Sequence, residues 1–424
     1  MRKWLCLLLL PFIMFVSGCN GAHEADQLAY VVAIGLDKGE NNHIIVTYQL
    51  AIPRQISGTG GSESDTSSSS EGATKSFVNI TLSAFTIAEA RNELNSVVAL
   101  PTVVYHSKMI IFGEGLAQSG LGDIIGPLFR FREYRGTMYV AVTQGSAQEF
   151  LEKNKPAITS STAKYYELML QSDSLSGFFL SSTLHKFYLG MKNYGSAPYA
   201  VYVGANPKVK AEKLSPDTKQ KPEGYLEVPK VAGEISRIGG DAAEFLGTAI
   251  FAGDKMVGLL DSHQTRLVSL FLTRLASSYI SIEDIHPAAP KKGINLRFRA
   301  SGPPDVQTEI VEGKPIAHIR LNLEGEITSV ASGINYEEPE YREKLEKRLS
   351  ELFTQELQGL IYYLQGCNSD VLSIGDYFCP HFSTFPEFID FDWKGKFKEA
   401  QIDGDVQFKI RRTGLLWKTN PIEE

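Results

Sequence analysis

The chain has 424 residues, a formal net charge of −7, 43% hydrophobic residues and 21% charged residues. This composition excludes a wholly disordered chain, a collagen-like repeat and a polytopic membrane protein. The acidic balance argues against nucleic-acid binding through a basic surface. Four cysteines are too few for a disulfide framework. The length predicts about two to four domains, each large enough to bury its own core.

The first 18 residues have the pattern of a signal peptide. Arg2 and Lys3 form a short positive segment, and residues 4–16 form an apolar run broken only by Pro11. A helix needs roughly 20 apolar residues to cross a bilayer, so this run is too short to span one. It fits the apolar region of a signal peptide instead. No later segment reaches ~18 uninterrupted apolar residues, so the sequence predicts no membrane-spanning helix after the signal.

The signal ends in Val16-Ser17-Gly18-Cys19, which is typical of a bacterial lipobox. A lipoprotein signal peptidase would cut before Cys19, which would carry an S-diacylglycerol and an N-palmitoyl group. More than one acyl chain suffices for stable anchoring. The alternative is a plain secretory signal with a cysteine here by chance. Removing residues 1–18 leaves 406 residues and lowers the net charge to −9, because Arg2 and Lys3 are lost.

Residues 19–28, which are mostly polar from Asn20 to Gln27, are expected to form a lipid tether. Residues 29–205 are expected to form an N-terminal α/β domain. Its expected strands lie at residues 29–36, 44–51, 77–82, 108–112 and 137–143. The first two strands resemble a hairpin, which favours a mixed sheet. Capping boxes starting at Thr86 and Ser146 predict two helix starts. Residues 57–74 are rich in Ser and Gly, cannot bury a core and predict a surface loop.

A change of composition marks the next boundary. Residues 204–230 are rich in Lys and Pro, so they predict a linker that leads into a middle domain at 206–288. A long surface loop inside one domain is the alternative. Within the middle domain, residues 246–260 predict a hairpin turning at Gly253-Asp254. Residues 262–280 predict a helix.

Residues 289–424 predict a C-terminal domain dominated by one long helix. Residues 339–365 place apolar side chains on one helical face, and Gly366 is expected to end the helix. This face is expected to lie on the sheet of the domain, while binding of the helix in a groove of a partner is the alternative. Strands are expected at residues 294–300, 316–323 and 400–411. The predicted fold class is therefore α+β, with mixed or antiparallel sheets.

The sequence contains no recognisable catalytic set. Its eight histidines are scattered, and the HExxH and GxSxG motifs are absent. Asp390 and Asp392 form a close acidic pair that is best interpreted as a solvated loop. We therefore expect no enzymatic activity, no cofactor and no metal site. Cys367 and Cys379 lie 12 positions apart, and the spacing fits either a disulfide or two separate thiols.

Five sequence blocks follow the lipobox in a characteristic order. They are Ile34-Gly35-Leu36-Asp37-Lys38, residues 106–121, residues 129–151, residues 247–258 and residues 370–377, followed by Trp393-Lys394 and residues 410–414. Together they resemble the C-subunit lipoproteins of bacterial spore germination receptors, the Ger(x)C family. Family members often have Trp-Asp-Arg directly after the lipidated cysteine, whereas this chain has Asn20-Gly21-Ala22.

The resemblance implies more than the composition does. It implies three α/β-type domains without an enzymatic site, held at the outer face of the spore inner membrane. It also implies two partners, a receptor A subunit and a multispanning B subunit, which respond to nutrients that trigger germination. Germinant recognition is attributed mainly to the membrane subunits of such receptors. The alternative is a lipoprotein that itself binds a small germinant or solute.

Overall fold

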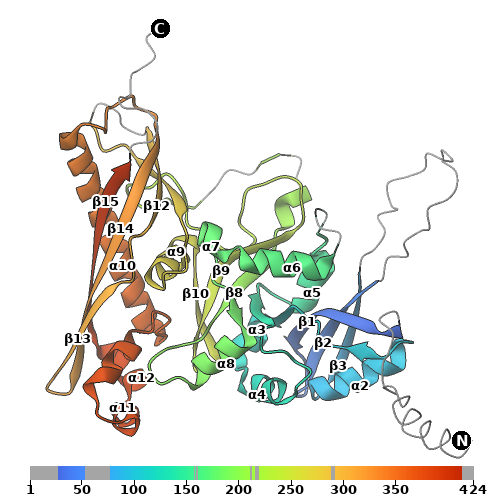
Figure 1. Cartoon of the computed structure of the whole chain (residues 1–424). Helices are drawn as coiled ribbons and strands as arrows, with labels where there is room; N and C mark the ends of the chain where they lie inside the picture. Colours follow the sequence, from blue (N-terminus) through green and yellow to red (C-terminus); the bar gives the residue numbers. More distant parts are fainter. Residues whose placement is uncertain are drawn as a thin grey trace, which may run out of the picture.

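The computed structural model describes residues 27–52, 77–156, 158, 161–210, 213–214, 219–287 and 292–412. The predicted signal peptide, Cys19 and the Ser-rich segment 57–74 lie outside the described residues. Figure 1 shows an elongated molecule, with β1, β2, β3 and α2 at one end and the long helix α10 at the other.

The larger sheet has ten strands and forms the N-terminal part and the middle of the molecule. Its strands are β1 (Ala29–Lys38), β2 (Ile44–Ala51), β3 (Phe77–Ala84), β4 (Thr102–Val103), β5 (Met109–Gly113), β6 (Tyr139–Thr143), β7 (Ser182–Thr183), β8 (Tyr199–Ala205), β9 (Ala243–Ala252) and β10 (Lys255–Leu260). The main order is β10-β9-β8-β6-β5-β1-β2-β3, while β4 pairs with β1 and β7 with β6. The central pairs β1/β5, β5/β6 and β6/β8 are parallel, and antiparallel pairs flank them. The expected mixed sheet and the β1–β2 hairpin are thus confirmed.

Helices cover both faces of this sheet. They are α2 (Ile87–Val97), α3 (Glu114–Ser119), α4 (Gly122–Arg130), α5 (Ala147–Lys153), α6 (Thr162–Gln171), α7 (Asp173–Ser176) and α8 (Leu184–Lys192), followed by the short 3-10 helix η2 (Pro207–Lys210). The predicted helix starts are confirmed, because Thr86 and Ser146 each accept a hydrogen bond from the backbone N–H three residues later. One core lies against α2, α3, α4 and α8, and a second against α5 and α6.

The smaller sheet has five strands and belongs to the C-terminal part. Its strands are β11 (Ser278–Glu283), β12 (Gly293–Ala300), β13 (Asp305–Val311), β14 (Lys314–Val330) and β15 (Gln401–Arg412). The order is β11-β12-β14-β13, with β15 parallel to β14 on its other side. The helices of this part are α9 (Ser262–Phe271), α10 (Pro339–Cys367), η3 (Ile374–His381), α11 (Phe385–Phe391), α12 (Trp393–Lys396) and η4 (Phe397–Glu399). Their apolar side chains share one large core with the sheet.

Two predicted helix boundaries were wrong. The helix expected at 262–280 ends at Phe271, because Thr273 adopts a left-handed conformation (φ 53°), and Ile280 belongs to β11. Gly366 does not end the long helix, which continues to Cys367 and stops at Asn368, whose φ of 52° is left-handed. Asparagine tolerates this conformation better than most residues, so it provides the stop that glycine was expected to give.

The larger sheet continues across the predicted boundary at residues 205/206. β8 ends at Ala205 and pairs with β9, which lies in the predicted middle domain. The β9–β10 hairpin therefore extends the N-terminal sheet, and α9 leads from it into the C-terminal core. The division into domains at 29–205, 206–288 and 289–424 remains a prediction, since the two sheets divide the chain differently.

Candidate interaction surfaces and the buried joint

The two thiols beyond the predicted anchor do not form a disulfide, since Cys367 and Cys379 are both free in the structure. Cys367 lies on the last turn of α10, where its sulfur faces Gly258 of β10. Cys379 lies on η3, which packs against β13 instead. Of the two interpretations, the structure therefore has two separate thiols.

The motif residue Asp37 ties β1 to the start of α5. Its carboxylate accepts hydrogen bonds from the backbone N–H groups of Ala147 (2.7 Å) and Gln148 (3.0 Å) and from the Ser146 hydroxyl (2.9 Å). Negative charge is favourable at a helix N-terminus. Gly113 lies beside this carboxylate with no room for a Cβ atom. Three of the five motif blocks thus meet at one structural contact.

A second motif contact joins the β9–β10 hairpin to α4. The Asp254 carboxylate accepts from the Gly122 N–H (3.0 Å), and its backbone carbonyl accepts from the Leu121 N–H (3.0 Å). Gly120 and Gly122 give the carboxylate room, since a Cβ atom on either would lie 2.9 Å from Oδ2. This contact explains why glycines interrupt the helical segment at this point.

A buried joint, formed by Ser369, Asp370, Gly375 and Trp393, connects the end of α10 to the larger sheet. The Asp370 carboxylate accepts from the N–H groups of Ile374 (3.1 Å) and Gly375 (2.9 Å) and from the Trp393 indole (2.9 Å). Its backbone carbonyl accepts from the Ala197 N–H (2.8 Å). The Ser369 hydroxyl donates to the Phe251 carbonyl of β9 (2.7 Å). Burial raises the pKa of Asp370 to about 6, against the opposing effect of these hydrogen bonds.

A cluster of charged residues, in which His263 and Arg266 are buried, lies where α9 meets α10. Arg266 is only 1% exposed, pairs with Glu227 (3.0 Å) and donates to the Tyr279 carbonyl (3.0 Å). His263 lies between Glu356 (3.3 Å) and Glu227 (3.7 Å). The sequence pattern assigned Arg266 to no site. Its hydrogen-bond partners lie 39 and 13 positions away in the chain, and residue spacing does not reveal contacts of that kind.

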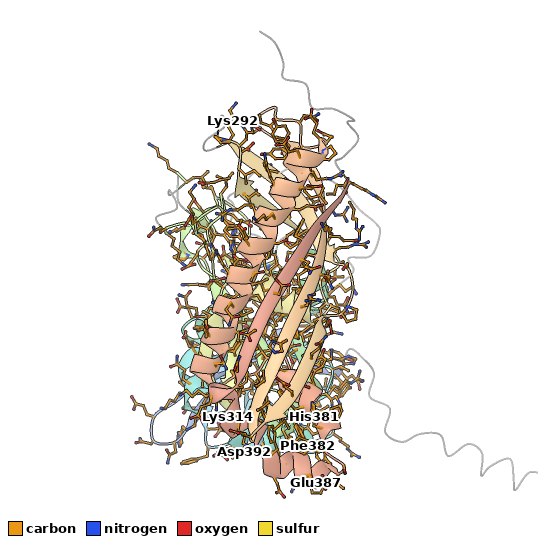
Figure 2. All side chains as sticks on the ribbon, turned by 90° about the vertical axis from the view of Figure 1, so that its left-hand side faces the viewer. Lys292, Lys314, His381, Phe382, Glu387 and Asp392 are labelled. Atoms are coloured by element: carbon orange, nitrogen blue, oxygen red, sulfur yellow. The ribbon has the colours of Figure 1, made fainter. Side chains whose placement is uncertain are left out.

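The free edge of β15 is covered by a polar stripe on α10, made of Glu346, Ser350, Thr354 and Gln358. These side chains accept hydrogen bonds from the backbone N–H groups of Ile410 (2.8 Å), Phe408 (3.0 Å), Val406 (2.9 Å) and Gly404 (3.0 Å). Four helical residues rise about 6 Å and two strand residues about 6.6 Å, so the two repeats match. Figure 2 shows α10 running along β15, with β14 on the far side of that strand.

Sequence reasoning missed this polar stripe, although its spacing of four residues is visible in the sequence. The helix was predicted from its apolar face, and that face does pack on the sheet, with Leu345, Leu349 and Leu357 fully buried. The alternative of groove binding to a partner finds no support in this arrangement. The face in question is occupied by the C-terminal core of the same chain.

A large groove lies between α2, α4 and the β1–β2 turn and has a volume of about 1040 Å³. Apolar side chains such as Phe85 and Ile124 line it together with polar ones, including His43, Asn92 and Asp123. At its rim Arg91 pairs with Glu133 and lies over the ring of Phe131, 5.7 Å from the centroid. Burial raises the pKa of the neighbouring Tyr134 to about 12.

The described part of the chain contains no cluster of three or more histidine, cysteine or acidic side chains arranged to hold a metal ion. Within the same residues, none of the helices combines the length and the apolar character that crossing a membrane requires. The acidic pair interpreted as a loop lies instead where α11 passes into α12, and Asp392 caps α12 by accepting from the Gly395 N–H (3.2 Å).

Two family models match most of the chain. The model described as "Spore germination protein N-terminal domain" matches residues 21–205, and "Spore germination B3/ GerAC like, C-terminal" matches residues 246–414. The chain belongs to the Ger(x)C family of spore germination proteins. The family membership expected from the five motif blocks is confirmed. This is not a known enzyme family.

Two full-length relatives from Bacillus subtilis (strain 168) support the assignment. The "Putative spore germination protein YfkR" is 22% identical, with 98% of this chain and 97% of the relative covered. "Spore germination protein KC" is 21% identical, with coverage of 99% and 97%. A solved structure, "Crystal Structure of the GerBC protein", superposes with a TM-score of 0.51 over 89% of this chain and 96% of that chain. At 16% identity it shows that the fold is shared, and the predicted mixed α+β class is confirmed.

Proposed function

We propose that the Ger(x)C protein is the lipid-anchored C subunit of a nutrient germinant receptor of bacterial endospores. It would assemble with an A subunit and a multispanning B subunit at the outer face of the spore inner membrane. The observation that carries the proposal is the pair of family matches that begins two residues after the lipobox cysteine, Cys19. Cleavage before Cys19 would leave the matched residues outside the cytoplasmic membrane, held by acyl chains.

The internal contacts made by the motif blocks support a role in assembly. The carboxylates of Asp37 and Asp254 accept hydrogen bonds from backbone N–H groups of distant segments, and the backbone carbonyl of Asp370 accepts one from Ala197. The contacts of Ser369 and Asp370 join the C-terminal part to the larger sheet, and one hydrophobic core around α9 and α10 includes Ile250 and Leu260 of that sheet. A scaffold of this kind suits a subunit that positions or stabilises its partners.

The anchor is tested by Cys19→Ala in spores. We expect the variant to leave the membrane fraction and to impair nutrient germination, because it lacks the thiol that accepts the diacylglycerol. Cys379→Ala is the matched control, since it removes another partly exposed thiol without touching the lipobox. A Cys19→Ala protein that stays membrane-bound and supports normal germination would show the anchor role to be wrong.

The groove between α2 and α4 favours a second candidate function, capture of a small germinant or solute. Its volume of about 1040 Å³ is at the upper end of ligand pockets, and apolar walls carry a few polar groups. Titration calorimetry of the mature chain with amino acids and sugars tests this function. Saturable heat that disappears in Asn92→Leu would support capture, whereas the absence of binding would leave the assembly role alone.

A further inference from the structure

Strand β1 starts beside residues 98–101, an exposed loop that precedes β4. The Ala29 N–H donates to the Pro101 carbonyl (3.0 Å), and β1 starts by pairing with β4 at Thr102. The nine residues 20–28 separate Cys19 from β1. Fully extended they span at most about 30 Å. If Cys19 is acylated, the loop that precedes β4 therefore lies within about 30 Å of the bilayer.

The last residue of α2, Val97, and Leu100 in this loop expose apolar side chains next to the start of β1. Val97 is 62% exposed and Leu100 is 38% exposed. Neither side chain is held by the core that buries Leu94 on the same helix. Figure 1 shows that α2 and β1 lie at the end of the molecule opposite α10.

A basic and aromatic segment lies next to the loop. Arg91 of α2 donates to the Thr102 carbonyl (3.5 Å), pairs with Glu133 and lies over Phe131, which is itself 45% exposed. Arg91 therefore holds residues 130–135, with the sequence Arg-Phe-Arg-Glu-Tyr-Arg, against the end of α2 and β4. Arginines 130, 132 and 135 are all exposed.

The charge of this region is opposite to that of the whole molecule. Four arginines, at positions 91, 130, 132 and 135, face one acid of the segment, Glu133, which is already paired. The chain as a whole carries −7. Partial burial, followed by the positive charges of Arg135 and Lys108, lowers the pKa of the nearby His106. The two acids of α2, Glu89 and Glu93, are each two residues from Arg91 and so lie on the opposite side of the helix.

We propose that these residues form a second membrane contact beside the lipid anchor. The anchor-proximal patch, defined as Val97, Leu100, Phe131, Arg130, Arg132 and Arg135, would rest on a bilayer rich in anionic lipid. Apolar and aromatic side chains enter the interfacial region, and each basic side chain is attracted to anionic headgroups. The contact would fix the orientation of the N-terminal domain, which an acyl chain on a polar tether leaves free.

The proposal rests on the proposed anchoring of the chain, so the test separates the two. The mature chain from residue 19, with Cys19→Ala and an N-terminal hexahistidine tag, is held on vesicles that contain nickel-chelating lipid. The tag replaces the acyl chains, and the result does not depend on acylation at Cys19. Hydrogen exchange is compared between vesicles of phosphatidylcholine alone and vesicles that also contain phosphatidylglycerol.

We expect amide exchange in residues 96–101 and 130–136 to slow several-fold when phosphatidylglycerol is present. The variant Arg132→Glu/Arg135→Glu should lose this protection, because each reversal converts attraction into repulsion. The matched control Arg411→Glu/Arg412→Glu makes the same charge change on exposed arginines of β15 and should retain it. Equal exchange on both vesicles, protection elsewhere in the chain, or unchanged protection in Arg132→Glu/Arg135→Glu would overturn the proposal. Lack of acylation at Cys19 would contradict only the anchor.

Discussion

Two edge strands, β15 of the smaller sheet and β3 of the larger sheet, differ in how their free edges are covered. At the C-terminal end, the free edge of β15 is covered, because four of its backbone N–H groups donate to the polar stripe of α10. At the N-terminal end, β3 closes the larger sheet. Its eight residues contain no charge, no proline and no glycine, and Val78 is 44% exposed. Charges and proline are among the devices that protect edge strands from pairing with other chains.

This difference indicates which sheet edge can pair with a strand of another chain. A strand edge whose amides are already bonded to a helix of the same chain cannot accept another strand without losing those bonds. An uncharged edge such as β3 can accept one. The anchor-proximal patch and the large groove also lie in the N-terminal part. We therefore expect the contacts with membrane and partners to concentrate there and not along the covered edge of β15.

The largest effect on stability is expected at the buried joint that connects the C-terminal part to the larger sheet. A Cβ atom at Gly375 would overlap the ring of Trp393 and lie 2.6 Å from the Gly195 carbonyl oxygen. Gly375→Ala should therefore cost about 3 kcal/mol or more in the free energy of unfolding, measured by chemical denaturation. Gly359→Ala is the control, because nothing lies within 4 Å of its Cβ position. It should stabilise α10 by ~0.5–1 kcal/mol. Equal stability of the two variants would mean that the joint is not tightly packed.

The same joint predicts a pH dependence. Burial raises the pKa of Asp370 to about 6 in the folded state, above its ordinary value of 3.8. The folded protein binds this proton more tightly than the unfolded chain, so the stabilisation is present below about pH 4 and is lost as the pH rises to about 6. Relative to Asp370→Asn, the wild type should lose about 3 kcal/mol over this range. Denaturation curves of both proteins between pH 4 and 7 provide the measurement, and a pH-independent difference would refute the prediction.

The next effect concerns the covered edge. Thr354→Val keeps the shape of the side chain but removes the acceptor of the Val406 N–H, which is bonded at 2.9 Å. An unsatisfied backbone group should cost about 1–3 kcal/mol in unfolding free energy. Thr328→Val is the control, since the Thr328 hydroxyl donates to the Asn295 carbonyl in an exposed setting. Losses of similar size in both variants would show that the polar stripe contributes nothing particular.

The smallest change in stability is expected at the open edge. Val78→Lys places a charge on β3 and should alter the unfolding free energy by less than about 0.5 kcal/mol. It should nevertheless reduce strand pairing with other chains, measured as co-purification of receptor subunits or as self-association by sedimentation. Val311→Lys is the matched control, because Val311 is 47% exposed on the edge strand β13. If the two lysine variants associate equally well, β3 is no docking edge.

Local patterns in the sequence predicted those parts of the fold that local contacts stabilise. The β1–β2 hairpin, the helix starts after Thr86 and Ser146 and the long helix from Pro339 follow from alternation, capping and periodicity. The helix at 262–280 was predicted too long because its apolar residues continue into β11, and periodicity separates short apolar helices and strands poorly.

The long-range contacts could not be predicted in the same way. The pairing of β8 with β9 joins segments that lie on either side of the Lys- and Pro-rich stretch, and the Asp37 cap of α5 spans 110 positions. The motif residues Asp37, Asp254 and Asp370 were recognised from the family resemblance, but their role as hydrogen-bond acceptors emerges only from the structure. The candidate membrane patch likewise depends on Arg91 bringing residues 130–135 to the start of β1.

Affinity purification of the tagged protein from spore membranes tests the central claim most directly. We predict that the receptor A and B subunits co-purify with the wild-type chain, and that both are lost with Cys19→Ala while Cys379→Ala retains them. A wild-type protein that is recovered from the membrane fraction without the other receptor subunits would contradict the account.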